Sequence, residues 1–139
     1  MKTVLQEGSS AVLKFDKGEE VVAVLTAFLK QQQIGGCFFT GLGAANLVEL
    51  GYYDIQSRAY VKKTVSEDLE IVAFSGNGSI KDGEHLVHAH GCFGKTDLST
   101  ISGHVFKMLV SITFELVLTK FTSPLRREFN QDIGLNLLN

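Results

Sequence analysis

The sequence predicts an α/β protein of the α+β type: a largely antiparallel, curled sheet of about seven strands with one main N-terminal helix packed on it. Three observations support this fold class. One early segment has helical hydrophobic spacing, and the chain after Gly35-Gly36 consists almost entirely of short extended runs joined by turns. The 139 residues, 45% hydrophobic and 20% charged, are typical of one globular domain spanning residues 1–139.

The first strand is predicted over residues 10–15 and the helix over residues 19–33. Asp16 followed by Glu19 resembles a capping box at the start of a helix. Gly35-Gly36 is expected to end the helix. Its apolar stripe consists of Val21, Val22, Val24, Leu25, Phe28 and Leu29.

The remaining strands follow in quick succession. Asp82-Gly83 is a strong signal for a hairpin turn. Gly41 and Gly43 do not fit a phosphate-binding loop, because no third glycine follows and the next segment resembles a strand; a tight turn or a close backbone approach is expected instead. Pro124 opens a closing segment. The predicted strands are residues 37–40, 47–54, 59–65, 69–74, 86–93, 101–107 and 111–119.

Composition excludes several classes of function. The net charge of −2 and the pI of about 6.1 argue against direct DNA binding by the monomer, because proteins that grip phosphates usually carry a positive excess. No apolar run approaches the roughly 20 residues of a membrane span, and the N-terminus lacks the apolar region of a secretory signal. We therefore expect a cytoplasmic protein in which Cys37 and Cys92 are free thiols.

Three histidines carry the concentrated chemistry. His88 and His90 flank Ala89 in a predicted strand, where alternate side chains share a face and their backbones are about 7 Å apart. His-x-His alone would fit ordinary surface histidines. His104 follows after a loop whose length lets a hairpin bring it opposite the pair. Three neutral imidazoles suit a single divalent metal, most readily zinc, with iron, copper or nickel as alternatives.

Two further residues lie near these histidines in the sequence, Cys92 and His85. Cys92 shares the strand face of His88 and His90, so it is either a fourth ligand or a small buried core thiol, and we favour the thiol. His85 lies on the opposite face beside the hairpin turn and is expected at the surface. A ligand set of three histidines leaves one coordination position open, as in catalytic metal sites.

Catalysis would also need a carboxylate near the metal. Glu70 and Glu115 lie within apolar strands, where an unpaired charge is costly. Either could support the metal site, as could Arg127. We favour a structural role, in which they pair with Arg58, Arg126 or Arg127 or lie at a subunit contact.

The chain resembles the plant and prokaryote conserved (PPC) domain, which follows the AT-hook in a class of plant nuclear proteins and also occurs alone in prokaryotes. The resemblance covers essentially the whole sequence. Asn130 stands where the family usually has aspartate, and Ser102 where it has glycine. The segments that carry the resemblance are residues 38–44, 49–54, 69–71, 75–77, 82–83, 88–90, 102–104, 114–116 and 127–130.

The resemblance implies a homotrimer with a metal on His88, His90 and His104. The DNA-binding role of the plant proteins depends on an Arg-Gly-Arg-Pro hook in the minor groove, and this sequence has no such hook. We therefore expect a trimeric, metal-binding regulatory or assembly module that contacts DNA weakly or through a partner. The alternatives are a metal-dependent enzyme acting on a small molecule, which we favour less, and a small-molecule sensor.

Overall fold

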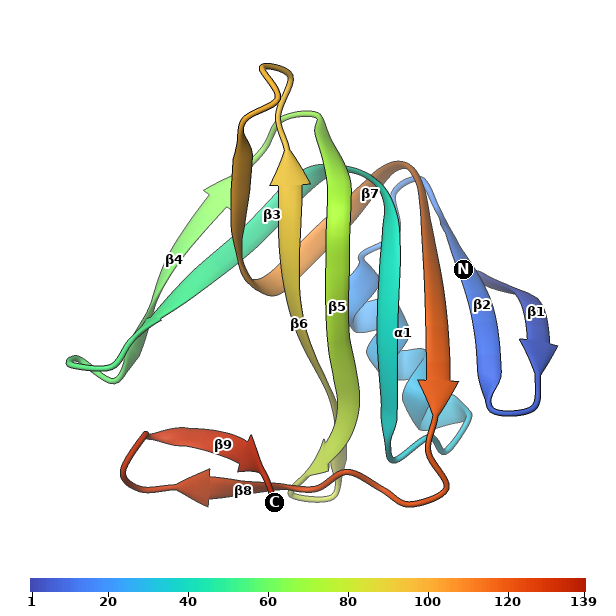
Figure 1. Cartoon of the computed structure of the whole chain (residues 1–139), viewed down its shortest axis with the longest axis vertical. Coiled ribbons are helices and arrows are strands. Elements are labelled where there is room, and N and C mark those ends of the chain that lie inside the picture. The colour runs from blue at the N-terminus through green and yellow to red at the C-terminus, as the bar shows by residue number, and fades with distance from the viewer.

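The computed structural model describes all 139 residues and consists of one helix and nine strands (Figure 1). The elements are β1 (Lys2–Glu7), β2 (Ser10–Asp16), α1 (Val21–Gln31), β3 (Cys37–Asp54), β4 (Ala59–Val65), β5 (Leu69–Lys81), β6 (Glu84–Gly94), β7 (Thr100–Lys120), β8 (Arg127–Asn130) and β9 (Leu135–Leu138). Seven strands form one sheet in the order β1-β2-β7-β6-β5-β3-β4, and every pairing within it is antiparallel. β7 also pairs with β3, so the sheet curls back on itself. The predicted curled, antiparallel sheet with one helix is confirmed.

Two strands are much longer than predicted. β3 runs through the glycine segment as one strand of 18 residues, and β7 continues as one strand of 21 residues where two were expected. Register shifts between Gly41 and Gly43 and along the β3–β7 ladder mark β-bulges, which bend a strand without ending it. A Cβ on Gly43 would lie 2.2 Å from the carbonyl oxygen of Thr113. The glycines therefore permit a close approach of two strands, and no turn forms there.

The helix begins and ends two residues inside its predicted bounds. Glu20 is the N-cap, and its carboxylate accepts hydrogen bonds from the backbone N–H groups of Val22 and Ala23. The N–H of Asp16 donates to the side chain of Glu19, as in a capping box. Asp16 is nevertheless not the cap, because the backbone is still extended at Glu20 and the helix begins after it. At the other end Gln33 adopts a positive φ of 54°, so the helix stops before the glycine pair.

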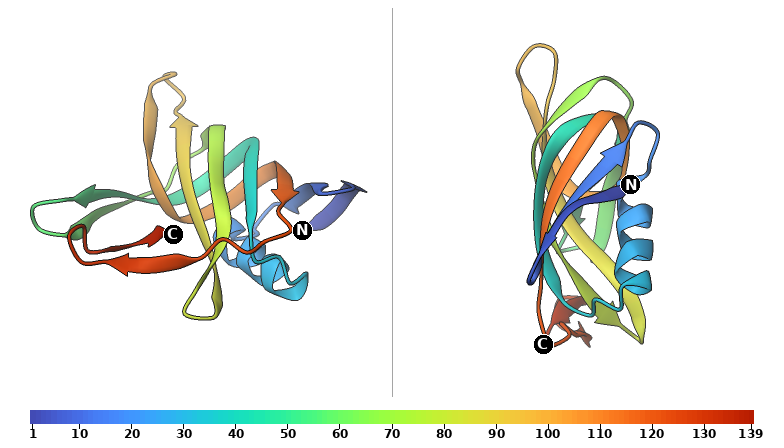
Figure 2. Two further views of the ribbon diagram at one scale, coloured as in Figure 1. Left: turned by 60° about the horizontal axis from the view of Figure 1, so that its bottom comes forward. Right: turned by 90° about the vertical axis from the view of Figure 1, so that its right-hand side faces the viewer.

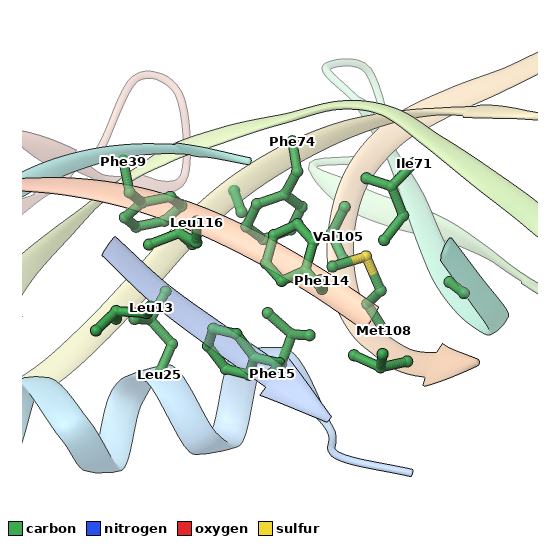
Figure 3. Close-up of a cluster of buried hydrophobic side chains, with 14 of the residues drawn as sticks. Leu13, Phe15, Leu25, Phe39, Ile71, Phe74, Val105, Met108, Phe114 and Leu116 are labelled. Atoms are coloured by element: carbon green, nitrogen blue, oxygen red, sulfur yellow. The ribbon is translucent and has the colours of Figure 1, made fainter. Parts of the chain in front are cut away.

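The core lies between the helix and the inner face of the curled sheet (Figures 2 and 3). Val21, Leu25 and Leu29 are the buried positions of the helix. Against them lies a cluster of phenylalanines, in which the rings of Phe74 and Phe114 meet edge to face at 5.3 Å. Each buried phenylalanine contributes roughly 2–3 kcal/mol to the stability of the fold, because its apolar surface is removed from water. The opposite, outer face of the sheet is not covered by the helix.

The C-terminal residues form a hairpin outside the main sheet. β8 and β9 pair only with each other, and they were not predicted because each has only four residues. The hydroxyl of Tyr53 donates to the carbonyl of Ile133, which ties the hairpin to the β3–β4 arm (Figure 2). The side chain of Asn130 accepts a hydrogen bond from the N–H of Ile133, within the turn of this hairpin.

Three smaller points complete the fold. Asp82 and Gly83 form the predicted hairpin turn between β5 and β6, and both have positive φ, 51° and 82°, as a type I′ turn requires. β1 was not predicted and pairs with β2 at the edge of the sheet. No helix of this structure has the length and apolar character needed to cross a bilayer.

Candidate metal centre

The three histidines meet on the outer face of the sheet. His88 and His90 alternate with Ala89 along β6, and Ala89 is buried in the core, so both rings point outward. His90 lies directly opposite His104 of β7 in the antiparallel ladder. The three ring centroids are 5.0–5.4 Å apart. Strand alternation thus pairs two of the rings, and the β6–β7 register adds the third.

The distances between the ring nitrogens suit a tetrahedral ion. One nitrogen from each ring lies within 4.8 Å of the others, and the two Nε2 atoms of His88 and His90 are 3.3 Å apart. Two ligands of a tetrahedral zinc ion, each bound at about 2.0–2.1 Å, are separated by about 3.3 Å. The pair of Nε2 atoms already has this separation.

The protonation states of two of these rings favour metal binding. Burial, with smaller effects of Arg127 and His90, lowers the pKa of His88 to about 4. Burial and the neighbouring His88 and His90 lower the pKa of His104 to about 4 as well. Both rings are therefore neutral at pH 7, which is the form that coordinates a metal. The Nδ1 atom of His104 is buried without any hydrogen-bond partner in the chain.

An aromatic wall encloses one side of the cluster. Tyr60 of β4 and Phe106 of β7 lie against His104, with ring centroids at 5.1 and 4.5 Å. The ammonium group of Lys62 sits 3.6 Å from the centre of the Phe106 ring and forms an ion pair with Glu49. Sequence reasoning missed these residues, because only the pairing of β3 with β4 and β7 brings them to the histidines.

The other side is open. His90 is exposed, and a hollow of about 310 Å³ lies beside it. A metal ion on the three histidines would therefore be reachable by a small molecule. The hollow is lined by Ala73, Ser75, His90, Gly91, Cys92, Ser102 and Gly103.

Arg127 reaches the cluster from β8. Its Nη2 lies 3.0 Å from Nδ1 of His88 and 2.9 Å from Oδ1 of Asn77, to which it donates. Nε donates to the hydroxyl of Ser79, and Nη1 donates to the carbonyl of Asn136. Every partner of this guanidinium is an uncharged group. The arginine is thus held rigidly beside a candidate ligand.

The remaining candidates lie elsewhere. Cys92 is half-buried on the same face as the histidines but does not belong to the cluster of converging ligand atoms. His85 is half-buried on the inner side, with an unpartnered Nε2, so it is less exposed than expected.

The two glutamates are also distant from the histidines in the sheet. Glu70 is exposed and pairs in register with Ala44 and Gly94, and Glu115 is exposed and pairs in register with Lys14 and Leu42. Neither forms an ion pair within the chain. The expected pairing with an arginine is therefore absent from the subunit, and the structure places no carboxylate among the converging ligand atoms.

A family model described as the Plants and Prokaryotes Conserved (PCC) domain matches residues 3–122. A protein of known structure from Bacteroides thetaiotaomicron, provisionally named as DNA-binding, shares 27% identity at a TM-score of 0.93, over 97% of this chain and 94% of that one. A metal-containing protein from Archaeoglobus fulgidus shares 32% identity at a TM-score of 0.87, over 100% of this chain and 99% of that one.

A plant- and prokaryote-conserved protein from Pyrococcus horikoshii has the same fold, with 24% identity and a TM-score of 0.88 over 100% of this chain and 97% of that one. No curated protein sequence matches significantly. The likenesses extend over nearly the full length of both partners, so the whole chain, including the β8–β9 hairpin, belongs to the shared architecture.

Proposed function

The chain belongs to the Plants and Prokaryotes Conserved domain family, and from this premise we propose that it is a homotrimeric module that binds one divalent metal ion per subunit and acts in regulation or assembly. The observation that carries the metal proposal is the convergence of His88, His90 and His104, with two Nε2 atoms 3.3 Å apart. The relative from Archaeoglobus fulgidus, described as metal-containing, supports it.

Zinc is the first candidate for this ion. Three neutral imidazole nitrogens are a common ligand set for zinc. Iron, copper and nickel also accept imidazole ligands and are the alternatives. His88 and His90 would bind through Nε2, and His104 would supply the third nitrogen. A bound ion of this kind acts as a Lewis acid and lowers the pKa of a water molecule in its open position.

Elemental analysis tests the metal site directly. Protein purified without added metal, then incubated with zinc and desalted, is expected to retain one ion per subunit. The variant His104→Gln should lose that ion, because two imidazoles bind far more weakly than three. His85→Gln serves as the matched control, since this histidine lies outside the cluster. Equal zinc content in both variants would overturn the proposal.

The trimer is supported by the apolar character of the outer sheet face. Phe38, Leu42, Val72 and Val117 are each between 47% and 61% exposed. The last three of these line a shallow hollow of about 280 Å³ together with Glu115. A continuous apolar patch of this kind usually marks an interaction surface. Another copy of the chain seated on this face would also cover Glu115, in keeping with a subunit contact.

The proposed relation to DNA is weak or indirect. Relatives are provisionally named as DNA-binding, but the net charge of this chain is −2 and the strongest basic features are isolated pairs. A gel-shift titration at low and moderate salt is the test. Salt-sensitive binding of duplex DNA at submicromolar trimer would show that DNA contact is direct, contrary to this proposal.

A metal-dependent enzyme or a small-molecule sensor is the second candidate. The open hollow of about 310 Å³ beside His90 is the observation that favours it, because a purely structural ion is normally sealed from solvent. The lack of a carboxylate in the cluster weighs against hydrolysis that needs a general base. The two versions of this candidate differ in turnover: an enzyme would convert its small molecule, whereas a sensor would only bind it.

A further inference from the structure

The cationic group nearest to His88 has no anionic partner. Arg127 is half-buried, and it forms no ion pair with any carboxylate of the chain. Its hydrogen-bond partners are the uncharged groups of Asn77, Ser79, Asn136 and His88. A partly buried charge is normally compensated by an opposite charge, and here the protein supplies none.

The other side of the cluster has no spare negative charge either. Lys62 lies over the ring of Phe106, next to His104, and its ammonium is already paired with Glu49. A divalent ion on the histidines would add to the charge of Arg127 in a site where no carboxylate is within ligand distance. An anion from outside the chain would balance the charge of the loaded site.

We propose, on the basis of the metal site proposed above, that the metal-loaded cluster binds the oxyanion group of a small molecule, a carboxylate or a phosphate, between the ion and Arg127. Guanidinium N–H groups, which form a planar fork, donate to both kinds of anion, and the N–H of Nη2 that faces His88 is the one such a ligand would use. The hollow of about 310 Å³ lies on the His90 side of the cluster, and its lining does not include Arg127. It gives a small molecule access to the ion, and Ser75 and Ser102 offer hydroxyl groups there to the part of the ligand that lies away from Arg127.

The hydrogen bonds of His88 show how metal and anion binding are linked. Nη2 of Arg127 can only donate, so Nδ1 of His88 accepts, and the neutral ring carries its proton on Nε2, facing Nε2 of His90. His88 would hold a metal through Nε2 only with its proton on Nδ1, which faces the N–H of Nη2 on Arg127. That N–H of Arg127 would then have no acceptor in His88 and would be free to donate to a ligand anion.

Cobalt-loaded protein gives the test, because the visible spectrum of the ion reports ligand binding without any need for turnover. Pyruvate and methylphosphonate are the carboxylate and phosphoryl probes, and pyruvamide is the uncharged counterpart of pyruvate. We expect either anion to change the spectrum saturably and pyruvamide to have no effect. The anion that binds with the higher affinity shows whether the natural ligand carries a carboxylate or a phosphoryl group.

Variants assign the effect to Arg127. Arg127→Gln is expected to weaken anion binding about 10- to 100-fold, the usual cost of losing a charged hydrogen-bond partner. Arg127→Lys, which keeps the charge but not the fork, should fall between. Arg126→Gln, at the exposed neighbouring residue, is the matched control and should stay within about twofold of wild type.

The outcomes separate the two proposals. If cobalt and zinc do not bind, the metal site and this inference fall together. If cobalt binds but neither anion changes its spectrum, or pyruvamide binds as well as pyruvate, only the oxyanion inference is overturned. Equal weakening by Arg126→Gln and Arg127→Gln would show a general charge effect and would also overturn it. The wild-type comparison of pyruvate with pyruvamide holds even if Arg127→Gln does not fold.

Discussion

Nη2 of Arg127 lies 3.0 Å from Nδ1 of His88, so a candidate metal ligand is held by a cation instead of a hydrogen-bond acceptor. Metal-bound histidines usually donate their second N–H to a carboxylate or carbonyl, which increases their affinity for the metal. The contact seen here has the opposite polarity. It would stabilise the metal-free state of the ring and oppose loading of the site.

Zinc affinity should therefore increase when Arg127 is replaced by an uncharged residue. We expect Arg127→Gln to bind zinc several-fold more tightly than wild type, because the glutamine carbonyl can accept the Nδ1 proton that a metal-bound His88 carries. Competition with a chromogenic chelator measures the change. A loss of affinity of 10-fold or more, typical when a supporting acceptor is removed, would contradict this view of the contact.

The metal-free protein should lose stability as the pH falls from about 6.5 to 5. Burial lowers the pKa of both His88 and His104 from 6.5 to about 4, so in this range the unfolded chain binds protons that the folded chain does not. The free energy of unfolding therefore decreases with decreasing pH. Urea unfolding with EDTA present measures it, and His104→Gln should show a shallower pH dependence than wild type.

The sequence predicted the local features of the fold and of the candidate site well. Alternation along residues 86–93 placed His88 and His90 on one face, and the Asp82-Gly83 turn set the hairpin that contains them. The helix and the strand at residues 59–65 were also correctly placed in outline. These features depend on periodicity and turn chemistry within about ten residues.

Features that depend on long-range pairing were not predictable in the same way. The continuity of β3 through Gly43 requires the close backbone of Thr113, and neither segment alone indicates the other. Arg127 reaches His88 only because the chain after Pro124 returns along the sheet, where the N–H of Ile80 donates to the carbonyl of Leu125. Single-sequence patterns contain no information on such distant contacts.

Gly43 should be among the least replaceable residues of the fold. Its φ is 154°, and a Cβ would lie 2.2 Å from the carbonyl oxygen of Thr113, so Gly43→Ala combines backbone strain with a clash against another strand. We expect a loss of at least about 2–3 kcal/mol in the free energy of unfolding. Gly8→Ala, which has a φ of 55° but open space around it, is the control and should cost only about 1 kcal/mol.

Assembly should depend on the outer sheet face. Leu42 is 61% exposed in the apolar patch and lines the same hollow as Val72 and Val117, so a charge there would be buried without a partner in the proposed trimer. We expect Leu42→Lys to give a monomer by light scattering while the circular dichroism spectrum stays that of the wild type. Leu98→Lys, at an 89% exposed loop residue outside this patch, should leave the mass of the assembly unchanged. A trimer that survives Leu42→Lys but not Leu98→Lys would place the subunit contact at the β6–β7 loop, and the apolar patch would then need a different partner.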